Sequence, residues 1–120
     1  MSRILILEDD EMTMMLYKEI LDEENHEIIG VSDAHGILNS LDKKPELILM
    51  DMNFPGMSCN ELASKIKTEN YLKNIPLIIV SGDENIQKFS DDLGARAFLK
   101  KPFSLDDFID TVRRHLPKEH

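Results

Sequence analysis

The sequence predicts an α/β protein in which helices cover both faces of a parallel sheet. Five short apolar runs alternate with segments of helical periodicity. The runs are apolar throughout rather than at alternate positions, as in strands that are buried on both faces. Parallel strands joined by right-handed crossovers place their carboxyl ends at one edge of the sheet, so the residues that follow the runs are the candidates for a functional site.

The composition is that of a small, acidic, soluble protein. At 120 residues, the chain is expected to form a single domain over residues 1–120. Its apolar runs of about four residues are too short to span a bilayer, so we expect no membrane partner. Its one cysteine cannot build a disulfide framework, so we expect a cytoplasmic location. A net charge of −9 argues against direct nucleic-acid binding, which requires patches of Lys and Arg.

Each predicted strand is an apolar run bounded by polar or turn-forming residues. The first run ends in an acidic cluster, the third is followed by the turn Pro55–Gly56, and the fourth begins after Pro76. The second is rich in Ile and Val, and the fifth is short and ends in two lysines. The strands are thus predicted at residues 3–7, 26–32, 47–51, 77–80 and 97–99.

The helices are predicted from apolar residues that recur every three or four positions. In the first helix, which is expected to end near residue 25, Met12, Leu16 and Ile20 form the predicted apolar stripe, with Tyr17 and Leu21 beside them. The same spacing predicts further helices at residues 34–41, 60–70, 86–93 and 105–116.

Two of these helices carry predicted caps. Gly94 stands where a helix C-cap is expected after the fourth helix. Ser104 is the predicted N-cap of the fifth helix, with Asp107 three residues later as a weaker form of the capping box.

Polar residues stand at the carboxyl ends of four of the predicted strands. Glu8 and Asp9 follow the first, Asp51 ends the third, Ser81 ends the fourth and Lys101 follows the fifth. Three carboxylates brought together repel one another unless a cation compensates, and a site of oxygen ligands favours Mg²⁺. A lysine and a hydroxyl would complete a cradle for a phosphoryl group, with Asp51 as the nucleophile. Alternatively, Asp51 could cap a turn, and the acidic cluster could start a helix at the surface.

At these spacings, the chain resembles the receiver domain of two-component response regulators over residues 4–116. The family's motifs are matched by Glu8–Asp9 as the acidic pair, Asp51 as the phosphoacceptor, Ser81 as the Ser/Thr and Lys101–Pro102 as the Lys-Pro pair. Residues 52–57 match the family pattern of a hydrophobic residue, Pro and Met after the phosphoacceptor. Each match is weak alone, but together they identify the family.

The resemblance implies a flavodoxin-like fold, a three-layer (βα)5 sandwich with strand order 2-1-3-4-5. It also implies Mg²⁺ bound by Asp9, Asp51 and the backbone carbonyl of Asn53, with Glu8 nearby or acting through water. The Lys101–Pro102 bond is often cis in the family, and a cis bond before Pro costs only about 0.5–1 kcal/mol.

The resemblance further implies a signalling switch rather than an enzyme that acts on external substrates. A phosphohistidine on a sensor histidine kinase or a histidine phosphotransfer protein would phosphorylate Asp51. Ser81 and Lys101 would then contact the phosphoryl group, and Phe98 would rotate inward. The face made by the fourth helix, fifth strand and fifth helix would change for a downstream output protein or domain, with the chain a monomer or a phosphorylation-dependent dimer.

Other family positions carry finer expectations. Asn53 and Asp83 match positions that tune the lifetime of the phosphoryl group. Met14 and Met15 lie beside the acidic cluster, where the family docks histidine-bearing helices, and adaptable Met side chains suit such a contact. Cys59 replaces a common Gly, and we interpret it as a structural thiol.

Two alternative functions differ in their requirements. An aspartate-nucleophile phosphatase typically carries a second acid two residues after the nucleophile, where this chain has Asn53. A receiver-like module that only binds proteins would be expected to lack one of the acids, the phosphoacceptor or the lysine, and all of them are present.

Overall fold

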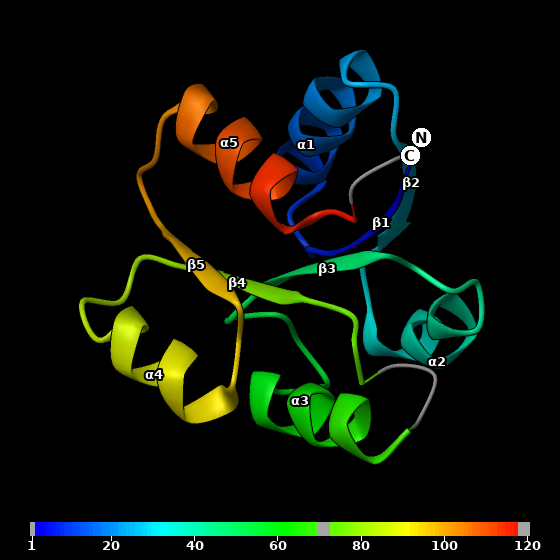
Figure 1. Cartoon of the computed structure of the whole chain (residues 1–120), viewed down its shortest axis with the longest axis vertical. Helices are drawn as coiled ribbons and strands as arrows, with labels where there is room; N and C mark the ends of the chain where they lie inside the picture. Colours follow the sequence, from blue (N-terminus) through cyan, green and yellow to red (C-terminus); the bar gives the residue numbers. More distant parts are fainter. Residues whose placement is uncertain (1, 70–72, 118–120) are drawn as a thin grey trace.

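The computed structural model describes residues 2–69 and 73–117. Strands and helices alternate along the chain, as predicted (Figure 1). In chain order, the elements are β1 (Arg3–Leu7), α1 (Glu11–Glu23), β2 (Glu27–Val31), the 3-10 turn η1 (Ala34–Gly36), α2 (Ile37–Leu41), β3 (Leu47–Asp51), α3 (Cys59–Thr68), β4 (Leu77–Ser81), α4 (Ile86–Leu93), β5 (Ala97–Lys100) and α5 (Leu105–His115).

The strands form one parallel sheet in the order β2-β1-β3-β4-β5. This order confirms the predicted flavodoxin-like fold. The register aligns Leu7 with Met50 and Asp51 with Val80, so Glu8, Asp51 and Ser81 follow one another across the same edge of the sheet. None of the helices in the described residues is both long and apolar enough to cross a membrane.

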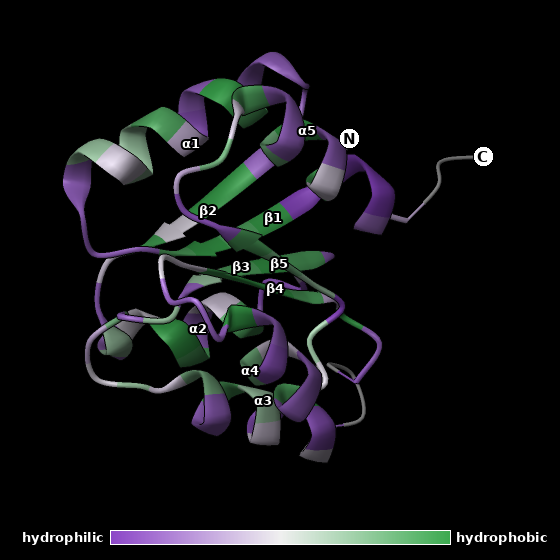
Figure 2. Cartoon of the chain, turned by 90° about the vertical axis from the view of Figure 1, so that its left-hand side faces the viewer, coloured by the Kyte–Doolittle hydropathy of each residue, from purple (hydrophilic) through white to green (hydrophobic). Residues whose placement is uncertain are grey.

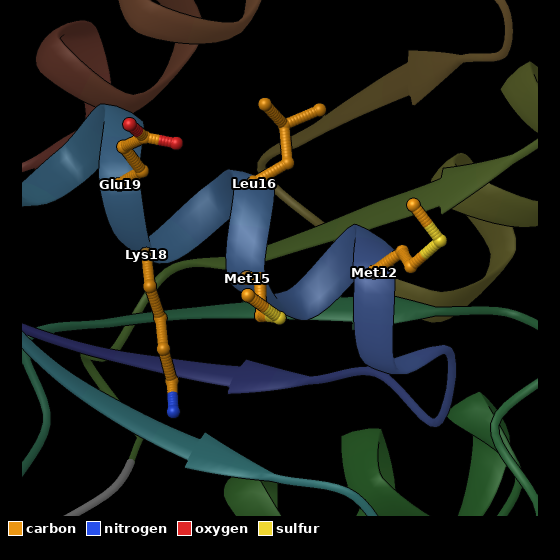
Figure 3. Close-up of a pocket in the computed structure, with 5 residues that line it drawn as sticks. All are labelled: Met12, Met15, Leu16, Lys18 and Glu19. Carbon is orange, nitrogen blue, oxygen red and sulfur yellow. The ribbon is translucent and has the colours of Figure 1, made fainter.

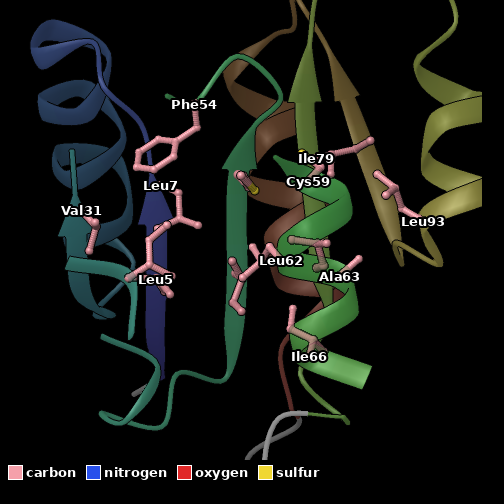
Figure 4. Close-up of a cluster of buried hydrophobic side chains, with 14 of the residues drawn as sticks. Leu5, Leu7, Val31, Phe54, Cys59, Leu62, Ala63, Ile66, Ile79 and Leu93 are labelled. Carbon is pink, nitrogen blue, oxygen red and sulfur yellow. The ribbon is translucent and has the colours of Figure 1, made fainter. Parts of the chain in front are cut away.

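The sheet is the middle of three layers. α1 and α5 lie on one face, and α2, α3 and α4 lie on the other (Figures 1 and 2). Figure 2 shows hydrophobic residues along the strands and on the helix sides that face them. The residues of β1, β3 and β4 therefore divide between two cores. In the core toward α3, Leu5 and Leu7 pack with Leu62 and Ile66 (Figure 4).

The prediction of which apolar stripe of α1 faces the sheet is wrong. Met12 is 80% exposed and Leu16 is 53% exposed, whereas Met14, Tyr17 and Leu21 are buried against the sheet. Both stripes have helical spacing, so periodicity alone does not choose between them. The ring of Tyr17 stacks on Phe108 of α5, and this contact turns the second stripe inward.

The helix caps follow the predictions in two places. Gly94 adopts φ 74° as the C-cap of α4, and the Ser104 hydroxyl accepts a hydrogen bond from the Asp107 backbone N–H at 3.0 Å. The sequence analysis missed a full capping box at α3, made by Ser58 and Glu61. The predicted end of that helix, Asn70, lies outside the described residues.

We expect Gly56→Ala to destabilise the protein. Gly56 has φ +88°, and a Cβ there would lie 2.7 Å from the Ala34 Cβ. A left-handed conformation costs a non-glycine residue about 1–2 kcal/mol, and the clash adds to this cost. Urea unfolding should show the loss, whereas Gly82→Ala, whose Cβ would have no neighbour nearer than 4.0 Å, should lose less. Equal losses in the two variants would contradict this account.

Candidate functional site

Asp51 and Lys101 form the centre of the site at the carboxyl edge of the sheet. The Asp51 side chain is 6% exposed, and its Oδ2 atom accepts a hydrogen bond from the Lys101 Nζ at 2.7 Å. Its Oδ1 atom accepts a hydrogen bond from the backbone N–H of Asn53 at 2.8 Å. Both carboxylate oxygens are therefore oriented by donors on different strand ends.

Ser81 and Lys101 are held next to each other by the sheet. The Lys101 backbone N–H donates to the carbonyl of Ser81 at 2.9 Å, and the bond from Lys101 to Pro102 is cis. The buried Ser81 hydroxyl accepts a hydrogen bond from the Asp83 backbone N–H at 3.0 Å. Burial disfavours the charge on Lys101, but its hydrogen bond and attraction to Asp51 prevail and raise its pKa.

Glu8 brings a second carboxylate into the buried part of the site. It is 3% exposed, and burial together with the charges of Asp51 and Asp9 raises its pKa, despite a hydrogen bond from the Asp10 backbone N–H. Asp9, the other member of the predicted acidic pair, is exposed. Glu8 is thus a buried acid near Asp51, and its negative charge is poorly compensated.

Asp10 is the member of the acidic cluster that starts a helix, which was weighed only as an alternative for the cluster as a whole. Its carboxylate accepts hydrogen bonds from the backbone N–H of Thr13 at 2.9 Å and from the Thr13 hydroxyl, and these bonds lower the pKa of Asp10. Asp10 is therefore the N-cap of α1. An Asp placed three residues before Thr at a helix start is the signal that could have revealed this cap.

The oxygen donors fit a magnesium ion that keeps part of its water shell. Among residues 2–69 and 73–117, no group of three His, Cys, Asp or Glu side chains is arranged to hold a metal ion. Mg²⁺ usually binds through one or two carboxylates, with water as the remaining ligands, so it does not require such a group. Burial, together with the charges of Asp51 and Asp9, raises the pKa of Glu8, so a bound cation would favour the ionised form of this carboxyl.

The structure also places the remaining predicted residues. Asn53 and Asp83 are both exposed, each two residues beyond a strand end, at the mouth of the site. Phe98 is half-buried and packs against the core beneath α3 and α4. Cys59 is buried in that same core, and burial, with the charge of Asp51, raises its pKa to about 11. Cys59 is thus a structural thiol.

The outer face of α1 carries an apolar ridge beside the acidic residues. Figure 3 shows Met12, Met15 and Leu16 on this face, with Lys18 and Glu19 further along the helix. Met15 is 63% exposed, whereas Met14 is buried in the core, so only Met15 of the predicted pair lies free on the surface. We call Met12, Met15 and Leu16 the α1 ridge.

A groove connects this face to the site. Its volume is about 450 Å³. The groove is lined by Glu8, Asp9, Glu11, Met14, Met15, Lys18, Gly30 and Ser32. The groove therefore runs from the acids of the site to Met15.

Comparison with known proteins identifies the class. The model of the response regulator receiver domain matches residues 4–113, and this match covers most of the chain. The chain belongs to the response regulator receiver family, the receiving half of two-component signalling.

Relatives and solved structures agree with this family. The chain is 30% identical over 119 residues to the polar-differentiation response regulator DivK of Brucella anthropi, with 94% of each chain covered. The receiver domain of a signal transduction histidine kinase from Syntrophus aciditrophicus superposes with a TM-score of 0.85 at 28% identity, over 97% of this chain and 90% of that one.

A second solved structure shares the fold at lower identity. It is the receiver domain of a sensor histidine kinase from Pseudomonas aeruginosa, with a TM-score of 0.82 at 19% identity, over 95% of this chain and 96% of that one. That protein holds a magnesium ion coordinated in its active site cleft.

We expect Glu8→Gln to stabilise the protein at pH 7 without Mg²⁺. A carboxyl whose pKa is raised by folding weakens the folded state once the pH exceeds its ordinary pKa, so removing its charge is favourable. The midpoint of thermal unfolding should rise, by about 4 °C for each kcal/mol by which the charge weakens the folded state. The advantage should vanish near pH 4, where Glu8 is largely protonated in both states, and should shrink when Mg²⁺ is added at pH 7. A lower midpoint in the variant at pH 7 would contradict the expected repulsion.

Proposed function

We propose that this protein is a phosphoacceptor switch in which Asp51 takes a phosphoryl group in a Mg²⁺-dependent reaction. The observation that carries the proposal is the ion pair between the buried Asp51 and the half-buried Lys101, with Ser81 held beside it by a backbone hydrogen bond. Family membership supports the same reaction.

The proposed step moves one phosphoryl group from a histidine to Asp51. A carboxylate oxygen of Asp51 forms a bond to phosphorus while the phosphorus–nitrogen bond of the phosphohistidine breaks, and its electron pair stays on the imidazole nitrogen. Lys101 would pair with the oxygens of the arriving group, and the Ser81 hydroxyl would donate to one of them.

Asp9, Asp51 and the Asn53 carbonyl would hold Mg²⁺, with Glu8 nearby. When bound, the ion neutralises charge on the carboxylates and on the transferring phosphoryl oxygens. The chain itself supplies the orientation of Asp51, since both of its carboxylate oxygens accept hydrogen bonds before any donor arrives.

Phosphorylation would be transmitted to the surface formed by α4, β5 and α5. Ser81 ends β4 and is aligned with Lys100 of β5, so a shift of Ser81 toward the phosphoryl group reaches both strands. Phe98 is half-buried on β5 and makes its contacts through packing alone, because it has no hydroxyl. A downstream protein or domain would bind this surface, with the chain a monomer or a phosphorylation-dependent dimer.

Asn53 and Asp83 at the mouth of the site would control access of water and so the lifetime of the phosphoryl group. The chain would promote only its own phosphorylation and dephosphorylation, so it is not an enzyme for external substrates. We place it in the cytoplasm on the basis of its composition.

The phosphoryl donor would bind across the α1 ridge. The donor is a sensor histidine kinase or a histidine phosphotransfer protein, and the groove from Met15 to Glu8 and Asp9 gives its histidine a path toward the site. Met15 is the predicted docking residue that is exposed, whereas Met14 supports α1 from the core.

The first experiment measures the mass of the intact protein after incubation with acetyl phosphate. The wild type should gain one phosphoryl group only when Mg²⁺ is present, and Asp51→Asn should gain none. Circular dichroism would establish that the variant is folded. If the folded wild type gains no phosphoryl group over time courses that begin within seconds, the protein is a constitutive binding module instead.

Met15→Ala should slow phosphoryl transfer from a protein donor but not from acetyl phosphate. The substitution removes apolar contact area outside the site, so we expect about a tenfold effect on the protein donor alone. Leu38→Ala is the matched control, because Leu38 is a similarly exposed apolar residue on α2, in the opposite layer. Equal transfer from the protein donor to the wild type and to Met15→Ala would exclude the ridge as its docking site.

A further inference from the structure

Three aromatic rings form a continuous stack between α1 and the segment that carries Lys101. Tyr17 of α1 stacks on Phe108 of α5, with ring centroids 4.8 Å apart and planes 14° apart. Phe108 also stacks on Phe103, with centroids 5.9 Å apart and planes 11° apart. Phe103 follows Lys101 by two residues. The stack therefore links the core between α1, α5 and the sheet to the backbone beside the site.

The position of Lys101 depends on that backbone. Its side chain is 40% exposed, and within the described residues its amine makes one hydrogen bond, to Asp51. A lysine side chain is long and flexible, so the position of its amine also depends on where its backbone is held. On one side, the backbone is fixed by the hydrogen bond from the Lys101 N–H to Ser81. On the other side, the backbone is held by the Phe103 ring, which stacks on Phe108.

The far end of the stack is firmly held. Phe108 is 1% exposed and Tyr17 is 5% exposed, and both belong to the core between the sheet and the layer of α1 and α5. Burial, with the charges of Glu8 and Asp51, raises the pKa of Tyr17. The nearly parallel rings of Tyr17 and Phe108 are buried and restrict one another, and the half-buried Phe103 ring packs against this core, which makes the stack a stiff connection.

We propose that the stack of Tyr17, Phe108 and Phe103 positions Lys101 against Asp51 and thereby sets the rate of phosphoryl transfer. In this proposal the rings take no part in the chemistry themselves and act as positioning residues through Lys101. This inference rests on the proposed phosphorylation of Asp51 and adds to it a role for α1 and α5 in the reaction.

The test is a double-mutant cycle on the rate of phosphorylation by acetyl phosphate with Mg²⁺. Phe108→Leu keeps an apolar side chain but removes the ring, and we expect it to slow the reaction about tenfold in the wild-type background. In a Lys101→Met background, the same substitution should change the rate less than twofold, because the positioned amine is already absent. A general loss of folding would instead slow the reaction in both backgrounds.

Two further variants separate the ring stack from stability and from the Tyr17 hydroxyl. Val112→Ala removes buried bulk one turn further along α5 without removing a ring, so it should destabilise the protein but leave the rate unchanged. Tyr17→Phe keeps the stack and should keep the rate, whereas Tyr17→Leu should slow it. Tyr17→Leu and Tyr17→Phe also replace Phe108→Leu in the cycle if that variant does not fold.

The outcomes are distinct. An effect of Phe108→Leu that disappears in the Lys101→Met background supports the proposal. An unchanged rate in Phe108→Leu and Tyr17→Leu, or the same slowing in both backgrounds, overturns it while leaving Asp51 as the phosphoacceptor. A wild type that is not phosphorylated at all overturns the proposed function and this inference together.

Discussion

The burial of carboxylates at one edge of the sheet is the constraint on which the site depends. Glu8 follows β1, Asp51 ends the neighbouring β3, and both are almost inaccessible to water. Buried carboxylates are costly to ionise without compensating positive charge. Lys101 supplies one positive charge, on Asp51, whereas burial, together with the charges of Asp51 and Asp9, raises the pKa of Glu8. A divalent cation would favour the ionised form of Glu8, which is why the same edge suits both metal binding and phosphoryl transfer.

The parallel sheet is what brings these charges together. Asp51 and Lys101 are 50 residues apart in sequence, and they meet because β3, β4 and β5 are adjacent and end at one edge. The apolar strands are packed on both faces. Burial of apolar side chains in two cores therefore stabilises the backbone that carries the charged groups. The site also lies where the two helix layers meet the edge of the sheet, so contacts in either layer can influence it.

The sequence predicted the sheet and its edge well, but it did not predict how the first helix is turned. Unbroken apolar runs leave few alternatives for strands, and the residues after them fall at one edge by topology alone. α1 instead carries two apolar stripes, and contacts with residues distant in sequence determine which one is buried, among them Phe108, 91 positions after Tyr17. For the same reason, Met14 was assigned to the surface. Ring stacking between separate helices leaves no local pattern in the sequence, so the link to Lys101 was found only in the structure.

The exposed thioethers of the α1 ridge have a chemical consequence beyond packing. Met12 and Met15 are 80% and 63% exposed, so oxidants in solution can reach their sulfur atoms. Oxidation to the sulfoxide turns an apolar, flexible side chain into a polar one, and reductases can reverse it. The face that would receive the phosphoryl donor is therefore sensitive to the redox state of its surroundings, while Cys59, sealed in the core, is not.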